Sequence, residues 1–277
     1  MKKKKIKIKW KNIITLFIIL FSSITLFFSF KNILKWNIDS NKTKNQITDI
    51  TKETKITEVK DNENTEIIEQ KEEIKKNNPY WDYIKMNLIN VDFKELKNTN
   101  PDTLGWIQVN GTNINYPFVQ TNNNDYYLNH SYNKKYNEAG WVFLDYRNNI
   151  NYLNKNTIIY AHGRLDTTMF GSLKNILKSG WLNDTNNYVI KLSTETENTL
   201  WQVFSVYKIP TTTDYIQTNF ISDYEFNEWA NMLLKRSAHN FNTSINEIDK
   251  VLTLSTCYND DEKVVLHAKL IKKETRN

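Results

Sequence analysis

The single cysteine of this 277-residue chain lies where a nucleophile could act. Cys257 follows the apolar run of residues 251–256 and precedes a polar stretch that begins at Tyr258. A thiol at the end of a strand opens onto loops, whereas most cysteines are small buried packing residues. With one thiol, an internal disulfide and a zinc site built from several thiolates are both excluded. A nucleophilic role and a packing role are the two alternatives for Cys257.

A nucleophilic cysteine needs a partner that stabilises the thiolate and later protonates the leaving group, and histidine is the usual partner. The chain has four histidines. His162 closes the apolar run of residues 157–161 and therefore resembles Cys257 in placement. His130 lies in a loop rich in Asn and Tyr, His239 at a predicted helix end and His267 inside the last predicted strand, which favours solvated, capping and packing roles. The spacing alone leaves open whether His162 and Cys257 meet.

These two residues must be positioned by a β-rich domain. From Pro79 onward aromatic residues become frequent, and eight segments have the composition of short strands: residues 105–109, 113–119, 141–145, 157–161, 188–192, 200–209, 251–256 and 263–271. Ser222 and Glu225 have capping-box spacing, and apolar residues follow them at helical intervals, which predicts a helix over 222–239. The pattern predicts a mainly β fold, an eight-stranded closed β-barrel with peripheral helices.

The N-terminal part has a different composition. Residues 12–30 carry no charge, and as a helix they would span about 28 Å, close to the hydrocarbon thickness of about 30 Å. Seven lysines precede this run and two closely follow it, which predicts a cytoplasmic N-terminus. A cleaved signal peptide is the alternative, but its apolar region is usually shorter. We predict a basic cytoplasmic tail at 1–11, a transmembrane signal anchor at 12–30, an extracellular stem at 31–78 and a folded domain at 79–277.

The net charge of +6 comes from the N-terminus. Without the seven lysines of positions 2–11, the chain has 30 basic and 31 acidic residues, so no basic surface for nucleic acid is indicated. The six glycines form neither of the two common nucleotide-phosphate motifs. No acidic cluster has the spacing of a calcium site. We therefore expect no metal, no cofactor and no nucleic-acid partner.

The residues around Cys257 resemble a known family. Thr253-Leu254-Ser255-Thr256-Cys257 is similar to the signature of the sortases, the membrane-anchored cysteine transpeptidases of Gram-positive bacteria. Other stretches resemble the class B branch: Gly105-Trp106-Ile107 with Tyr116-Pro117, Asp125-Tyr126-Tyr127-Leu128-Asn129-His130, Asp145-Tyr146-Arg147-Asn148 and His267-Ala268-Lys269-Leu270. The resemblance covers essentially all of 79–277. It implies an eight-stranded sortase barrel in which His162 is the acid/base and Cys257 is the acyl-forming nucleophile.

One position departs from the family pattern. Sortases place an arginine at the start of the last strand, and counting back from residues 267–270 puts Lys263 in that place. The resemblance implies that this arginine donates hydrogen bonds to the substrate and the developing oxyanion. Lysine keeps the positive charge but lacks the planar pair of donors, so reduced or altered activity is expected. Ser255 and Asn129 are groove residues by resemblance, and ordinary strand-end and loop hydrogen bonding is their alternative role.

The function that the resemblance implies is a two-step acyl transfer. Cys257 would attack a threonyl carbonyl in a sorting motif of the Asn-Pro-x-Thr-x type, near the C-terminus of a secreted protein. The thioacyl group would then pass to an amine of a cell-wall precursor or of another protein. Two alternatives stay open. A cysteine peptidase would use the same pair with water as acceptor, and a surface binding module would have lost its activity with the arginine.

Overall fold

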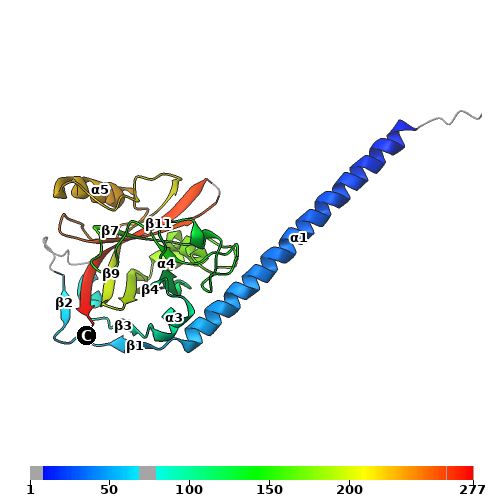
Figure 1. The fold of residues 1–277 in the computed structure, drawn as a ribbon. Helices are drawn as coiled ribbons and strands as arrows, with labels where there is room; N and C mark the ends of the chain where they lie inside the picture. Colours follow the sequence, from blue (N-terminus) through cyan, green and yellow to red (C-terminus); the bar gives the residue numbers. More distant parts are fainter. Residues whose placement is uncertain (1–8, 69–78, 260, 277) are drawn as a thin grey trace, which may run out of the picture. The chain divides into compact units, whose positions relative to one another are not determined.

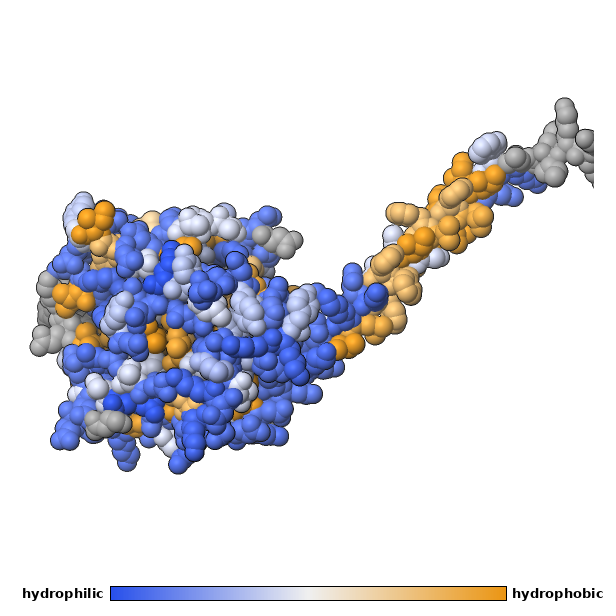
Figure 2. All heavy atoms as spheres, in the orientation of Figure 1, coloured by the Kyte–Doolittle hydropathy of each residue, from blue (hydrophilic) through white to orange (hydrophobic). Residues whose placement is uncertain are grey.

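The computed structural model describes residues 9–68, 79–259 and 261–276, and the chain divides into Met1–Lys42 and a compact unit, Thr43–Asn277 (Figure 1). The first helix, α1 (Trp10–Glu53), contains the predicted span at 12–30 and continues into the predicted stem. By length and composition alone, it could cross a membrane. Figure 2 shows hydrophobic residues gathered along it. The first eight residues of the predicted tail lie outside the described part of the chain.

Eight strands of the compact unit close into a barrel. They are β4 (Thr103–Val109), β5 (Asn115–Val119), β6 (Phe143–Leu144), β7 (Asn156–Tyr160), β8 (Val189–Thr194), β9 (Glu197–Pro210), β10 (Val251–Cys257) and β11 (Glu262–Thr275). They pair in the order β10-β7-β6-β5-β4-β8-β9-β11, and β11 pairs back to β10. Each of the eight predicted strands overlaps one of these. The predicted mainly β fold with an eight-stranded barrel is therefore confirmed.

Large aromatic side chains fill the main core of the barrel. Trp106 and Phe118, from β4 and β5, are fully buried there together with Trp141. The turn between these two strands contains Gly111, whose φ of +69° is a left-handed conformation that glycine adopts without strain. β4 and β5 are antiparallel, with Trp106 opposite Pro117. Their pairing is the hairpin that an Asn-Gly turn favours.

Part of the segment expected to be a solvated stem is built into the compact unit instead. β1 (Ile56–Val59) pairs with β3 (Leu88–Val91), and β2 (Thr65–Ile67) pairs with the end of β11. Only some isoleucines of this segment contribute to the core: Ile50 is buried in it, and Ile47, Ile56 and Ile68 pack against it. Ile38 and Ile67 stay exposed. Residues 69–78 of the predicted stem lie outside the described residues, and the predicted domain boundaries stay a prediction.

The helices are peripheral and mostly short. They are α2 (Tyr80–Tyr83), α3 (Lys94–Thr99), α4 (Ser179–Leu182), α5 (Asp223–Arg236) and the 3₁₀ helices η1 (Tyr126–Leu128), η2 (Gly171–Leu177) and η3 (Thr185–Asn187). Ser222 Oγ caps α5 by accepting a hydrogen bond from Glu225 N, as the capping-box spacing predicts. The Glu225 carboxylate accepts from Ile221 N, one residue before the expected partner. The buried face of α5 packs in a second core with residues of β9, β10 and β11.

Candidate active site

β7 and β10 are parallel neighbours, and they end at the same edge of the barrel. Their register pairs Tyr160 with Ser255. The two chain segments stay side by side one residue further, because Thr256 Oγ1 donates a hydrogen bond of 2.7 Å to Ala161 O. The next positions on the two chain segments are His162 and Cys257. Residues in register on parallel strands project to the same side of a sheet, so both side chains reach one cavity.

Gly163 allows the two chain segments to approach closely just beyond His162. A Cβ atom at this position would lie 2.1 Å from Cys257 O and 3.0 Å from Thr256 Oγ1. Real Cβ atoms do not come so close to a backbone oxygen, because the van der Waals repulsion is too large. Only a glycine fits this approach without a shift of the backbone that carries Cys257.

The loop after Gly163 is fixed by its own polar contacts. Phe170 N donates to His162 O at 3.0 Å, which closes the loop onto the histidine backbone. Inside the loop, Arg164 Nη2 and Asp166 Oδ2 form an ion pair of 3.1 Å with both side chains nearly buried. Asp166 Oδ1 also accepts from Thr168 N. The backbone of His162 is therefore held in place, while its ring is partly exposed.

Lys263 contacts the thiol directly. The antiparallel register of β10 and β11 pairs Cys257 with Lys263, and Lys263 Nζ donates to Cys257 Sγ at 2.9 Å. The connection between the strands is short, and Tyr258 N donates to Glu262 O within it at 2.8 Å. Glu262 itself pairs with Lys208 of β9, at 2.8 Å. The β10–β11 register therefore places a lysine nitrogen within hydrogen-bond distance of the sulfur.

The imidazole of His162 is held by a backbone carbonyl. His162 Nε2 donates to Leu128 O at 2.7 Å, since a carbonyl oxygen can only accept. None of the hydrogen bonds of the described residues joins His162 to Cys257. Catalytic hydrogen bonds often form only when substrate is bound, so this geometry is compatible with an acid/base role.

A cavity of about 320 Å³ opens beside these side chains. In addition to His162, Cys257 and Lys263, it is lined by residues from four places: Asn124 and Leu128 around η1, Phe143, Tyr160 and Ala161 of the β6–β7 region, Thr211, Thr212, Thr213, Tyr215 and Ile216 after β9, and Ser255 and Thr256 of β10. This volume lies at the lower end of the range of ligand sites. Within the described ranges, no group of three or more His, Cys, Asp or Glu side chains could hold a metal ion.

Of the two groove residues expected from the sequence, one lines the cavity and the other does not. Ser255 is buried and lines the cavity, and its Oγ is 2.9 Å from Tyr215 Oη. Asn129 is exposed at the end of η1, and it is not among the lining residues. From the same segment, Asn124 and Leu128 line the cavity instead.

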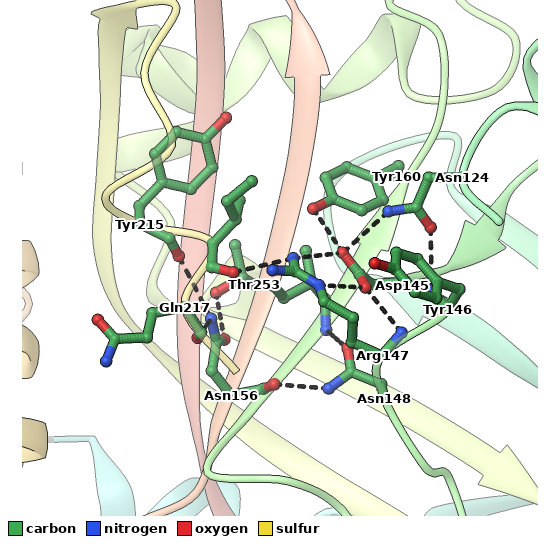
Figure 3. Close-up of polar contacts among 12 residues, drawn as sticks. Asn124, Asp145, Tyr146, Arg147, Asn148, Asn156, Tyr160, Tyr215, Gln217 and Thr253 are labelled. Atoms are coloured by element: carbon green, nitrogen blue, oxygen red, sulfur yellow. Dashed lines mark hydrogen bonds and ion pairs between the residues drawn. The ribbon is translucent and has the colours of Figure 1, made fainter. Parts of the chain in front are cut away.

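A polar network around Asp145 includes residues that line the cavity, among them Asn124 and Tyr160 (Figure 3). The carboxylate of Asp145 is fully buried, and it accepts from Arg147 Nη2 at 2.7 Å, Tyr160 Oη at 3.0 Å and Asn124 Nδ2 at 3.1 Å. Burial alone would raise the pKa of Asp145, but the hydrogen bonds and charge of Arg147 outweigh it and lower the pKa below its usual value. Asp145 therefore stays ionised and fixes two of the lining residues.

The same network ties residues 211–217, the segment after β9, to the barrel. Arg147 Nη2 donates to Ile216 O at 3.0 Å, and Asn156 Nδ2 donates to Gln217 O at 2.8 Å. On the opposite side, α5 holds this segment, because the guanidinium of Arg236 makes two hydrogen bonds to the Asp214 carboxylate. The cavity wall is thus a loop whose position is fixed from two sides.

Comparison with known proteins identifies the family. The Sortase domain family matches residues 107–271. The chain belongs to the sortase family. Sortase B of Staphylococcus aureus is 35% identical over 184 residues, which cover 65% of this chain and 75% of that protein. Sortases are cysteine transpeptidases, so the predicted enzyme class is confirmed.

Two solved structures agree with this assignment. A Bacillus anthracis protein described as similar to sortase B has a TM-score of 0.63 at 32% identity, covering 84% of this chain and 94% of that chain. A sortase B complexed with triglycine has a TM-score of 0.61 at 34% identity, covering 65% of this chain and 85% of that chain. The class B resemblance of the sequence is therefore confirmed.

Several residues of this sortase cavity were not predicted from the sequence. Tyr160 and Phe143 lie inside apolar strands, where their sequence pattern does not differ from that of core residues. The segment after β9, with Thr211 to Thr213, has the composition of an ordinary polar loop. Leu128 lies within the stretch 125–130 that carries the class B resemblance. This resemblance is the sequence signal that could have identified Leu128 as a cavity residue.

Proposed function

We propose that the chain is a membrane-anchored transpeptidase whose nucleophile is Cys257. One observation carries the proposal: β7 and β10 end in register, so that His162 and Cys257 share a cavity in which Lys263 Nζ lies 2.9 Å from the sulfur. The thiol, a titratable ring and a cation are the three groups that acyl transfer through a thioester requires.

In the first step, Cys257 attacks the threonyl carbonyl of a sorting peptide of the Asn-Pro-x-Thr-x type. Lys263 stabilises the thiolate beforehand and faces the negative oxygen that develops during the attack. The ring of His162 leaves Leu128 O and protonates the departing amine, which completes the thioacyl intermediate. Ser255 and Tyr215 line the cavity where the peptide would lie.

In the second step, an amine of the cell wall attacks the thioester. His162, neutral after its first proton transfer, removes a proton from this amine, and the Cys257 thiolate leaves. The solved sortase B complex with triglycine supports a glycine amine as the acceptor. We assign the acceptor to a cell-wall precursor and the donor to a secreted surface protein, and no cofactor takes part.

The assay that tests this proposal uses the full chain in detergent. A peptide of the Asn-Pro-x-Thr-x type is added with and without triglycine, and products are identified by mass spectrometry. We expect a peptide–triglycine amide, a thioester on Cys257 in the absence of triglycine, and neither with Cys257→Ala. Lys263→Ala should slow thioester formation about 100-fold, the usual cost of losing one oxyanion donor.

The outcomes separate the competing functions. If triglycine never enters the product and only the free acid forms, the enzyme is a cysteine peptidase. If neither a thioester nor any cleaved or transferred product forms, the chain is a binding module without activity. If Lys263→Ala forms thioester at the wild-type rate, the assigned role of Lys263 is wrong.

We also propose that α1 anchors the enzyme with its N-terminus in the cytoplasm and the compact unit outside. The support is the apolar stretch of α1 and the excess of lysines before it. Protease added to intact cells should digest a tag at the C-terminus and spare a tag at the N-terminus. Digestion of the N-terminal tag instead would reverse the assigned orientation.

A further inference from the structure

Lys263 is a primary amine, and it lies in direct contact with the reacting sulfur. The pair is set by the strands themselves, because Cys257 and Lys263 are opposite each other in the β10–β11 ladder. Their side chains meet at 2.9 Å, and both line the cavity. In a thioacyl enzyme, the carbonyl carbon is bonded to this sulfur. Because Nζ contacts the sulfur at 2.9 Å, it can approach that carbon to the separation of about 3–3.5 Å that a near-attack geometry needs.

Acylation changes the charges around Lys263. Before acylation, the ammonium can donate to a thiolate. In the thioester the sulfur carries no negative charge, so the ammonium loses the anion that it contacted. The nearest carboxylate along the chain, Glu262, is held by Lys208 at 2.8 Å and by Asn259 Nδ2 at 2.8 Å. Among the ion pairs of the described residues, none replaces the lost partner of Lys263.

We propose that Lys263 Nζ is an internal acceptor, which takes the acyl group from Cys257 when no external amine arrives. This inference rests on the proposed thioacyl mechanism. Lys263 first gives a proton to neutral His162 or to water. The neutral amine attacks the thioester carbon, the N–C bond forms and the C–S bond breaks, and the electron pair leaves with the sulfur. The second amine proton goes to the thiolate, so the products are an Nζ-acyl amide and a free Cys257 thiol.

The consequence is an enzyme that inactivates itself when acceptor is scarce. An amide on Nζ removes the positive charge beside Cys257 and leaves a peptide tail in the cavity. An arginine in the same place could not react in this way, because its guanidinium stays protonated in proteins. The replacement of arginine by lysine therefore adds a reaction as well as altering oxyanion binding. An external amine at high concentration competes with Lys263 and protects the enzyme.

The test follows the covalent state of the full chain in detergent after addition of a lysine-free Asn-Pro-x-Thr-x peptide without triglycine. Hydroxylamine then cleaves thioesters and spares amides. We expect a hydroxylamine-stable mass increase equal to the acyl fragment, mapped to Lys263 by tandem mass spectrometry. The adduct should be lost in Lys263→Arg and in Cys257→Ala, and excess triglycine should suppress it. Lys208→Arg, which changes a neighbouring lysine on β9, should leave it in place.

The same experiment distinguishes a failure of this inference from a failure of the proposed function. A hydroxylamine-labile adduct on Cys257 with no stable adduct on Lys263 would overturn the internal acceptor and leave the transpeptidase proposal intact. A stable adduct that persists in Lys263→Arg, on Lys208 or elsewhere, would also overturn it. The absence of any acyl adduct in the wild type, whether a thioester on Cys257 or an amide on Lys263, together with the absence of cleaved peptide, would refute the proposed function and this inference together.

Discussion

Because Gly163 has no side chain, the chain beyond β7 can approach the end of β10 closely. An added methyl group would lie 2.1 Å from Cys257 O and 2.9 Å from Lys174 Cε. The lysine carbon can move, because it ends a flexible side chain, but the carbonyl belongs to the residue that carries the thiol. The strain of such a substitution therefore displaces Cys257.

We expect Gly163→Ala to lower kcat/KM about 100-fold, because a displacement near 1 Å at a reacting group has about this effect. Overpacking should also lower the free energy of unfolding by about 1–3 kcal/mol. Transpeptidation rates and thermal unfolding check both values. The matched control is Gly180→Ala in α4, where no atom lies within 4 Å of the added Cβ, and it should keep wild-type activity. Wild-type kcat/KM in Gly163→Ala would show that the approach of the strands does not matter.

At the same scale, the sequence predicts the reacting residues better than the residues around them. Cys257 and His162 stand out because each ends an apolar strand, a signal that is local in the chain. Leu128 and Tyr215 carry no such signal, since a leucine or tyrosine in a loop has many possible environments. Their place in the cavity depends on contacts made by residues far away in sequence, such as Asn124 with Asp145.

Among the elements, the segment 211–217 shows how a loop becomes a rigid wall. The carbonyl of Ile216 accepts a hydrogen bond from Arg147 on one side, and Asp214 binds Arg236 of α5 on the other. Trp229 Nε1 of α5 adds a hydrogen bond to Asp214 O at 2.8 Å. Ordering this loop in the folded protein removes an entropic cost that substrate binding would otherwise have to meet.

Removing the hydrogen bond from Arg147 to Ile216 O should therefore weaken substrate binding more than it slows the chemical step. Arg147→Met combined with Asp145→Asn avoids leaving a buried carboxylate without its partner. We expect KM for the sorting peptide to rise about tenfold, which corresponds to about 1.4 kcal/mol for a lost charged hydrogen bond, with kcat little changed. Steady-state kinetics measure the effects on KM and on kcat separately. Lys97→Met with Glu195→Gln removes a surface ion pair outside the cavity lining and should leave KM unchanged. A fall in kcat at constant KM would contradict the positioning role.

The elements themselves are predictable where their pattern is local. The eight barrel strands stand out because apolar residues recur in short runs between turn residues, and the Ser222 cap marks the start of α5. β1 and β2 escape prediction because they are polar edge strands, recognised only by the strands that they join. The buried Lys272 is part of the same arrangement, since its Nζ donates to Ile84 O and Met86 O. Nothing within one short segment reveals such long-range partners.

At the scale of the whole molecule, a buried histidine couples folding of the barrel to pH. His267 is fully buried in β11, where Tyr207 Oη lies 2.8 Å from Nε2 and Thr253 Oγ1 lies 2.9 Å from Nδ1. Burial, with a further contribution from the charge of Arg236, lowers the pKa of His267 from 6.5 to about 3. The folded protein therefore keeps this ring neutral at pH values where the unfolded chain protonates it.

The sign of the effect follows from proton uptake. Between the unfolded pKa of 6.5 and the folded pKa of about 3, the unfolded chain binds one more proton at this site, so stability falls as the pH falls. Asp249 acts in the opposite direction, because burial raises its pKa and the folded state binds the extra proton. The pH range in which Asp249 affects stability begins near its ordinary pKa of 3.8 and extends upward. Substitution at His267 therefore separates the two effects best.

We expect His267→Gln to flatten the pH dependence of folding below pH 6.5, even if it also changes stability at neutral pH. For the wild type, His267 should contribute a loss of about 1.4 kcal/mol per pH unit as the pH falls below that value, which is the effect of one proton. Urea unfolding of the detergent-solubilised chain, followed by tryptophan fluorescence, gives the free energy at each pH. The slopes of the two proteins should differ by about one proton at low pH and converge above about pH 7, where neither state protonates the ring. Equal slopes at low pH would mean that the folded protein accepts a charged His267, through movement of Tyr207 or entry of water into the core.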